Sequence, residues 1–205
     1  MPTQTFILIG RSGCGKGTQG KLIEEYLKTQ DKVGGAKKAG RPVYYLETGA
    51  RFREFFKEES YSSSLAREIY DRDDRQPDFL AIWMWSHLLL KDLTEGEHLI
   101  ADGTCRSLPE AQVFDGALKF YKRKANIVYI DVGREWSEKR LLARGRADDA
   151  SLAKITKRLD WFDRDVMPAI EYYKNNSDYN FVAVNGEQPI ETVHADIVEK
   201  IKVLG

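Results

Sequence analysis

Four glycines and one lysine gather within ten residues near the N-terminus, which read Gly10-Arg11-Ser12-Gly13-Cys14-Gly15-Lys16-Gly17-Thr18-Gln19. Glycine has no Cβ, so the backbone N–H groups of such a turn can converge on an oxygen-rich anion. Lys16 adds a mobile positive charge, and the order fits the G-x-x-x-x-G-K spacing of a phosphate-binding loop. The chemistry that this stretch predicts is the binding of phosphate groups.

The residues on either side supply the two elements that such a loop requires. The apolar run TFILI precedes it as a strand, and apolar residues at helical spacing follow it over 16–29. Further strands are indicated by the runs VYYL, HLIA, NIVYIDV and YNFVAV. Further helices are predicted at 50–58, 62–71, 77–93, 107–121, 134–144, 150–175 and 189–203. This alternation predicts an α/β fold in which a parallel five-stranded sheet is flanked by helices and binds ligands at the carboxyl ends of its strands.

The composition argues against several classes of function. Lys and Arg together number 32, as do Asp and Glu, so the net charge gives no reason to expect a nucleic-acid or membrane partner. Cys14 and Cys105 form no zinc-binding pattern and suit a reducing compartment. No apolar run approaches the ~20 residues of a membrane helix, and the first residues lack the basic region of a signal peptide. We therefore expect a cytoplasmic protein without structural zinc.

Several motifs in order along the chain resemble those of the adenylate kinase family. GKGT continues the phosphate loop, YLETGARFREFF follows the second predicted strand, and LIADGTCRSLPEA follows the third. KRLLARGRADD and ITKRLDWFDRDVMPAIEYY are similar to the segments around the family's lid. The resemblance covers nearly the whole chain. It implies a single P-loop NTPase-like domain over 1–205, with a core at 1–47 and 94–205, a small helical lobe for the nucleoside monophosphate near 48–93, and a very short lid near 144–149.

The activity that the resemblance implies is reversible phosphoryl transfer from Mg-ATP to AMP, which gives two ADP. ATP would be the donor and carry the Mg²⁺, and the family expectation is a monomer. Phosphoryl transfer between two polyanions requires alignment and charge neutralisation. Arginine suits this task because its planar fork can hold two phosphate oxygens and stays charged.

The resemblance also implies a role for each matching residue. The donor nucleotide would be held by Gly13, Cys14, Gly15, Lys16, Gly17 and Thr18, with Arg140 near its base and Arg144 on its phosphates. The acceptor would be bound by Thr48, Arg53, Gly103, Arg106 and Glu110. Arg146 and Arg158 would bridge both nucleotides, so the expected catalytic set is Lys16, Arg106, Arg144, Arg146 and Arg158. Asp102 would orient Mg²⁺ through water, and Asp148 and Asp149 would help the lid to close.

The chain departs from the family pattern at several of these positions. Gly17 stands where Ser or Thr is usual, and Ala50 replaces an Asp, which leaves Asp102 to order the metal's water alone. Thr104-Cys105 replaces Phe-Pro, so we expect a looser acceptor loop. The lid lacks the few extra residues of the usual short form, so we expect closure to be a small movement.

Glu110 is the departure with the largest consequence for specificity. It replaces a Gln whose amide can match both the amino group and the ring nitrogen of adenine, whereas a carboxylate only accepts. AMP remains the favoured acceptor, and GMP, CMP or UMP are the alternatives. The alternative interpretation is that Glu110 faces solvent and does not contact the base. A third hypothesis is a nucleotide-binding module without activity, against which the retained Lys16, Asp102 and arginines argue.

The aromatic stretch around Trp83 and Trp85 admits two interpretations. It could be a base-stacking platform, but packing in the core and the lobe is favoured.

Overall fold

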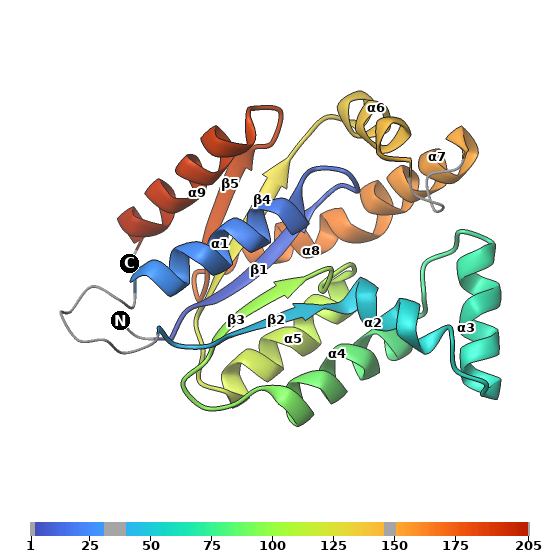
Figure 1. Cartoon of the computed structure of the whole chain (residues 1–205), viewed down its shortest axis with the longest axis horizontal. Helices are drawn as coiled ribbons and strands as arrows, with labels where there is room; N and C mark the ends of the chain where they lie inside the picture. The colour runs from blue at the N-terminus through green and yellow to red at the C-terminus, as the bar shows by residue number, and fades with distance from the viewer. Residues whose placement is uncertain (1–2, 31–39, 146–150, 205) are drawn as a thin grey trace.

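The computed structural model describes residues 3–30, 40–145 and 151–204. The strands are β1 (Thr5–Gly10), β2 (Val43–Glu47), β3 (His98–Asp102), β4 (Ala125–Asp131) and β5 (Asn180–Asn185). The helices are α1 (Lys16–Gln30), α2 (Thr48–Phe55), α3 (Tyr61–Asp71), α4 (Asp78–Asp92), α5 (Leu108–Phe120), α6 (Arg134–Arg144), α7 (Leu152–Trp161), η2 (Phe162–Val166, a π-helix), α8 (Met167–Lys174) and α9 (Ile190–Leu204). The strands form one parallel sheet in the order β2-β3-β1-β4-β5 (Figure 1), which confirms the predicted fold class.

Strand β1 lies at the centre of this sheet. Thr5 is paired with Leu99 of β3 on one side and with Ala125 of β4 on the other. All six residues of β1 are buried, as expected for a parallel strand that is covered on both faces. The phosphate loop therefore leaves the sheet at its centre, between the two strands that flank β1.

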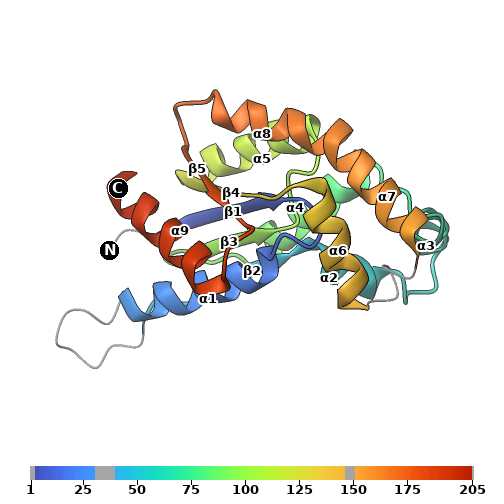
Figure 2. The same ribbon diagram turned by 90° about the horizontal axis from the view of Figure 1, so that it is seen from above.

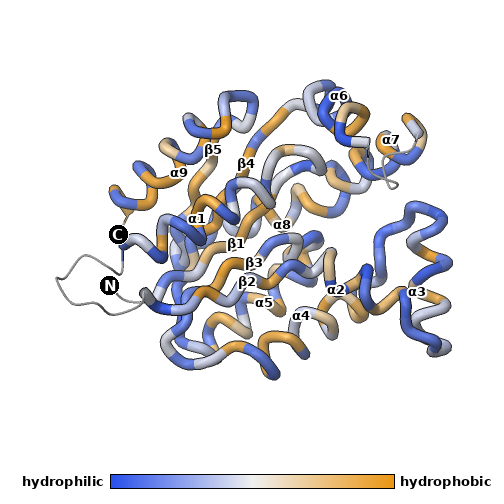
Figure 3. The backbone as a smooth tube through the Cα atoms, in the orientation of Figure 1, coloured by the Kyte–Doolittle hydropathy of each residue, from blue (hydrophilic) through white to orange (hydrophobic). Residues whose placement is uncertain are grey.

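Helices cover both faces of the sheet (Figure 2). Alternate side chains of β1 point to opposite faces, so Ile7 packs in one apolar cluster with α4, α5 and α8, and Leu8 packs in the other with α1 and α9. In Figure 3 the central strands are drawn largely in orange, whereas the helices alternate along their length. Within the described residues, no helix combines the length and the apolar character needed to cross a membrane.

Residues 48–93, which were predicted to form the small lobe, lie partly beyond the sheet and partly packed against it. Helices α2 and α3 project beyond the sheet (Figure 1). Helix α4 instead buries Met84, Trp85 and Leu88 in the larger apolar cluster, where the Trp85 ring lies 4.9 Å from that of Phe114. Trp83 is half exposed and stacked on His87. Trp85 therefore packs in the core, as favoured from the sequence, while Trp83 packs on Phe55 and His87 with half of its surface exposed.

The single helix predicted over 150–175 is interrupted in the structure. Ser151 caps the start of α7 by accepting a hydrogen bond from the Lys154 N–H, and α8 ends at Lys174. Between them, residues Phe162–Val166 form one π-helical segment. Such segments are rare and occur often at functional sites, and this one lies against the phosphate loop.

Candidate active site

The phosphate loop leads from the end of β1 into the first turn of α1. Gly13 and Gly15 have φ values of +85° and +98°, which glycine adopts without steric cost. Helix α1 begins at Lys16, so its positive N-terminal end faces the centre of the loop. The local geometry is that of an anion site made by backbone N–H groups and a helix N-terminus.

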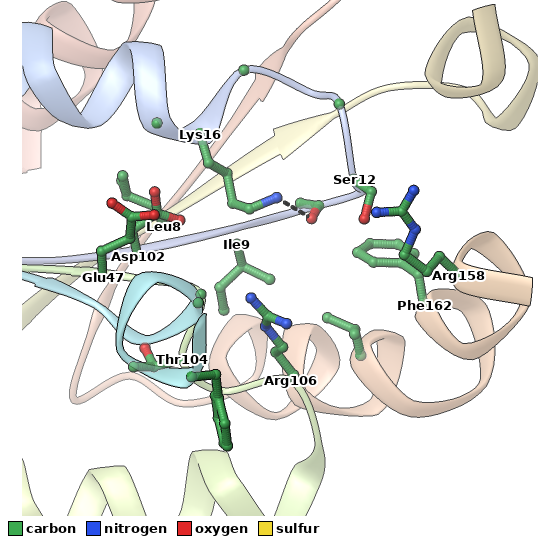
Figure 4. Close-up of a pocket in the computed structure, with 18 of the residues that line it drawn as sticks. Leu8, Ile9, Ser12, Lys16, Glu47, Asp102, Thr104, Arg106, Arg158 and Phe162 are labelled. Atoms are coloured by element: carbon green, nitrogen blue, oxygen red, sulfur yellow. Dashed lines mark hydrogen bonds between the residues drawn. The ribbon is translucent and has the colours of Figure 1, made fainter. Parts of the chain in front are cut away.

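The Lys16 side chain folds back over this loop. Its Nζ donates to the carbonyl oxygens of Gly10 at 2.7 Å and Arg11 at 3.0 Å, and it lies 3.6 Å from Cys14 Sγ. These partners hold the ammonium group against the loop, and Figure 4 shows it directed at a backbone oxygen there. The ammonium group is thus positioned to exchange carbonyl oxygens for phosphate oxygens.

Arg11 anchors the loop to the rest of the molecule. Its Nε donates to the Val132 carbonyl at 3.1 Å, and its guanidinium lies 4.6 Å from the centre of the Phe162 ring. It also forms an ion pair with Asp163. Phe162 and Asp163 both belong to the π-helical segment, so this segment holds the loop in place.

One large cavity extends from the phosphate loop to the α2–α3 region, with a volume of about 1040 Å³. Its charged lining includes the cations Lys16, Lys21, Arg53, Arg75, Arg106, Arg140, Arg144 and Arg158. Figure 4 shows Lys16, Arg106 and Arg158 reaching into it from three different elements. A cavity with so many cations fits a ligand, or a pair of ligands, with several negative charges.

A pair of carboxylates marks one wall of this cavity. Asp102 ends β3 and Glu47 ends β2, and the two residues are paired in the sheet register and lie side by side in Figure 4. Burial raises the pKa of Asp102, while the charges of Lys16 and Arg106 act in the opposite direction. The Tyr45 hydroxyl donates to Asp102 Oδ2 at 3.3 Å. A Cβ added to Gly17 would lie 3.8 Å from the same oxygen, so the loop approaches this carboxylate closely.

The β3–α5 loop presents Arg106 to the cavity. Gly103 has a φ of +78°, and a Cβ on it would lie only 2.7 Å from Arg106 Nη2. Cys105, the next-but-one residue, is fully buried with a φ of +57°, and its thiol lies 3.3 Å from the Tyr173 hydroxyl. Burial raises the pKa of this thiol to about 12. The loop is therefore tied to α8 through Cys105 while Gly103 leaves room for the arginine.

Glu110 does not line the cavity. Its side chain is 2% exposed, and Oε1 accepts a hydrogen bond from Arg75 Nη1 at 3.4 Å. Arg75 also contacts Asp78 at 2.6 Å and Asp165 at 3.4 Å. Burial raises the pKa of Glu110 to about 6, against the influence of Arg106 and Arg75. Glu110 therefore contacts Arg75, which lines the cavity, and is not itself part of the lining. Neither of the two positions considered from the sequence, in solvent or against the base, is the one observed.

A second, smaller cavity of about 280 Å³ lies on the other side of the phosphate loop. It shares Gly15, Thr18 and Arg140 with the large cavity, and Cys14 contributes to its lining. The Arg140 guanidinium lies 5.0 Å from the centre of the Trp136 ring, which also lines this cavity. The remaining wall comes from Gln19 of α1 and from residues that follow β5, namely Gly186, Gln188, Pro189, Ile190, Glu191 and Val193. The two cavities together form a continuous site around the loop.

Most residues predicted for the site meet around these two cavities. The large cavity is lined by Gly13, Gly15, Lys16, Gly17, Thr18, Arg53, Asp102, Gly103, Arg106, Arg140, Arg144 and Arg158. Thr48 is buried beside it as the first residue of α2, and Arg53 donates to Glu47 at 2.9 Å. Arg146, Asp148 and Asp149 lie outside the described residues, so their predicted roles are not addressed by the structure.

Sequence reasoning missed Glu47, Arg75 and Trp136. Glu47 had one available signal, because it is the last residue of a strand and the ends of adjacent parallel strands meet. Arg75 and Trp136 carry no such signal, since their partners lie in other elements. The sequence around Glu110 indicates a structural role, because Ser107-Leu108-Pro109-Glu110 fits the S-x-x-E pattern of a capping box at a helix start. Ser107 does cap α5, by accepting from the Glu110 N–H at 3.3 Å.

A phosphate loop at the centre of a parallel sheet, next to an arginine-lined cavity, defines a P-loop phosphotransferase of the nucleoside monophosphate kinase class. The family model described as adenylate kinase matches residues 8–178 of this chain. The chain belongs to the adenylate kinase family.

Curated relatives match nearly the whole chain. A protein named adenylate kinase from Flavobacterium psychrophilum is 29% identical over 206 residues, covering 97% of this chain and 98% of the relative. One of the same name from Methanocella arvoryzae is 28% identical, covering 97% and 99%. A third, from Oenococcus oeni, is 25% identical, covering 90% and 92%.

Proposed function

We propose that this protein catalyses the reversible transfer of the terminal phosphoryl group of ATP to AMP, which yields two ADP. The observation that carries the proposal is the convergence of Lys16, Arg106 and Arg158 on one cavity (Figure 4), in a chain that belongs to the adenylate kinase family. Glu110, on which the alternative acceptors rested, is engaged by Arg75 and does not favour them.

The chain's own residues supply positioning and charge. The backbone N–H groups of the loop and the Lys16 ammonium hold the donor phosphates, and Arg53 and Arg106 hold the acceptor phosphate. A phosphate oxygen of AMP attacks the terminal phosphorus of ATP, and the bond to the oxygen that bridges to the next phosphorus breaks, so that this oxygen stays with ADP. Arg144 and Arg158 neutralise the charge shared by the two ligands during this exchange. No side chain has to act as a nucleophile or base, because the attacking oxygen is already anionic.

The donor base is assigned to the smaller cavity. Arg140 supports this assignment because it lies between the two cavities and is stacked on Trp136. The phosphates would then run from this cavity over the loop towards Lys16.

The residues present fit Mg²⁺ carried by the nucleotide. Asp102 and Glu47 offer only carboxylate oxygens, which are the ligands this ion prefers, and two carboxylates suit an ion that keeps several waters. Asp102 would hold it through water. When bound, the ion would offset negative charge on the phosphates. We expect the protein to act as a monomer in the cytoplasm, in keeping with the two free and buried cysteines.

The proposal is tested by measuring ADP formation from Mg-ATP with AMP, GMP, CMP or UMP. We expect AMP to give the highest kcat/KM. Lys16→Met and Arg106→Ala should each lower kcat by a factor of about 10²–10³, because each removes a charge aimed at the transferring group. The control is Lys202→Met, a surface lysine of α9, which should keep wild-type rates. Near-normal rates for Lys16→Met or Arg106→Ala, with melting curves unchanged, would show that the assigned site is wrong.

A further inference from the structure

The loop at residues 72–77, which joins α3 to α4, is held against α7 by paired charges. Lys154 Nζ lies 3.2 Å from Asp73 Oδ2, and Lys157 Nζ lies 2.7 Å from Asp74 Oδ1. Lys157 also donates to the Arg72 carbonyl at 2.8 Å. Figures 1 and 2 agree in placing α3 and α7 at the same end of the molecule. These contacts join two segments that are about 80 residues apart in the chain.

The backbone of this loop is set by the way in which α3 ends. The Asp73 N–H bonds to the Tyr70 carbonyl at 2.9 Å and the Asp74 N–H to the Ile69 carbonyl at 3.0 Å. This is the pattern of a Schellman motif, in which the residue after the cap takes a left-handed conformation and is usually glycine. Here that residue is Asp73, with a φ of +56°.

Aspartate at this position supplies a carboxylate, although glycine would suit the left-handed backbone better. A left-handed conformation is unfavourable for residues with a Cβ and free for glycine, and aspartate is among the residues that adopt it more readily than most. Asp73 places its carboxylate on Lys154, and its side chain is only 17% exposed. A strained residue that makes a specific contact between two segments points to a role for that contact.

The same loop forms part of the wall of the large cavity. Asp73, Asp74, Arg75 and Gln76 line it from the side of the lobe, and Arg158 and Trp161 of α7 line it from the other side. Arg158 directly follows Lys157 in the chain. Arg75 adds a third tie, because its Nε lies 3.4 Å from Asp165 Oδ2 in the π-helical segment. The separation between the loop and α7 therefore sets the width of the cavity at this end.

We propose that Lys154 and Lys157 are positioning residues, which hold the 72–77 loop against α7 and keep the acceptor half of the cavity formed. The term "acceptor half" rests on the proposed function. The contacts of the 72–77 loop with α7 close this side of the cavity. Because the Lys157–Asp74 pair is exposed on both sides and the Lys154–Asp73 pair is exposed at the lysine, the two contacts weaken with salt.

The first experiment measures the position of the loop without any nucleotide. Spin labels on Ser62→Cys in α3 and Glu199→Cys in α9 report the distance between the lobe and the core, since both native cysteines are buried. Lys154→Met/Lys157→Met keeps the alkyl stems and removes the two charges. We expect a longer and broader distance distribution in this variant, and the same change in the wild type at 1 M NaCl. The matched control is Lys174→Met, which removes a surface lysine of α8 that pairs with Glu171. An unchanged distribution in the double variant would overturn the proposal.

The second experiment separates positioning from stability. In the double variant the KM for AMP should rise about three- to tenfold, with kcat unchanged or higher, since two exposed ion pairs are lost. Lys157→Asp and Asp74→Lys should each raise the KM, and the combined charge reversal should restore it to within about twofold, which would tie the change in KM to this contact. Melting curves that stay unchanged in the single variants would separate positioning from a loss of stability. An unchanged KM, or no recovery in the combined variant, would refute the positioning role. A protein that shows the distance change and yet transfers no phosphoryl group would refute the proposed function and leave the loop contact standing.

Discussion

Glu110→Gln is expected to stabilise the folded protein at neutral pH. Glu110 is buried behind the cavity wall, where Arg75 and the backbone of Arg106 are its polar partners. These partners do not compensate fully for the loss of water, since the pKa of Glu110 rises from its ordinary 4.5 to about 6. Glutamine has nearly the same shape as the protonated carboxyl group and never carries the charge.

The size of the effect follows from this pKa. Each tenfold change in the acid constant corresponds to 1.36 kcal/mol, so ionising Glu110 costs the folded state about 2 kcal/mol relative to the unfolded chain. Between pH 4.5 and about 6 the folded protein binds more protons at this group than the unfolded chain does, so its stability falls as the pH rises. The difference between Glu110→Gln and the wild type should therefore be near zero at pH 4 and reach about 2 kcal/mol above pH 7.

The assay is denaturant unfolding of both proteins across pH 4–8, with Glu199→Gln, an exposed carboxylate of α9, as the control. At pH 7.5 the variant should melt about 4–8 °C higher than the wild type. AMP should stay the preferred acceptor in both. A variant that is less stable at pH 7.5 would show that Glu110 is favoured as a buried anion. A stability difference that does not change with pH would show that folding does not raise the pKa of Glu110. A switch of acceptor caused by the substitution would show that Glu110 reaches the base.

Two further substitutions test the packing around the site. Gly103→Ala should lower kcat at least tenfold and reduce stability by about 1–2 kcal/mol. The reason is that alanine would have to adopt the left-handed backbone of Gly103 and its Cβ would collide with Arg106 Nη2. Wild-type kinetics would mean that Arg106 acts from a different position. Trp85→Ala should destabilise the protein by about 3–5 kcal/mol without changing the rate per folded molecule, since Trp85 is 1% exposed and packs on Phe114; a large change in KM with unchanged stability would instead assign Trp85 to ligand binding.

The fold was predictable because its local signals agree with one another. TFILI is apolar throughout, as a central parallel strand must be, and the glycines that follow it are incompatible with either a longer strand or an earlier helix. The phosphate loop was predictable for the same reason, since its backbone conformation depends on residues within the loop itself. The arginines could be predicted only through the resemblance, because nothing local distinguishes a cavity-lining Arg106 from a surface arginine.

The features that were missed depend on partners distant in the chain. Arg75 meets Glu110 and Asp165, which follow it by 35 and 90 residues, and no period or spacing relates them. The π-helical segment was hidden in a continuous helical pattern, because Phe162 and Val166 are spaced as an α-helix would place them. The start of α2 at Thr48 was missed by two residues, since its cap position is occupied by Glu47, which makes no capping bond to the helix.

The central position of β1 has a consequence for how the chain is made. This strand is synthesised first, but it pairs with β3 from residue 99 and with β4 from residue 125. At about 5–20 residues per second, a ribosome needs roughly 6–24 s to add the 120 residues that separate Thr5 from Ala125. Throughout that interval six apolar-rich residues and their backbone groups have no native neighbours on at least one side. In the nascent chain, the strand that precedes the phosphate loop therefore stays unpaired and prone to aggregation for this whole interval. A chaperone that shields the first 30 residues should raise the yield of folded protein.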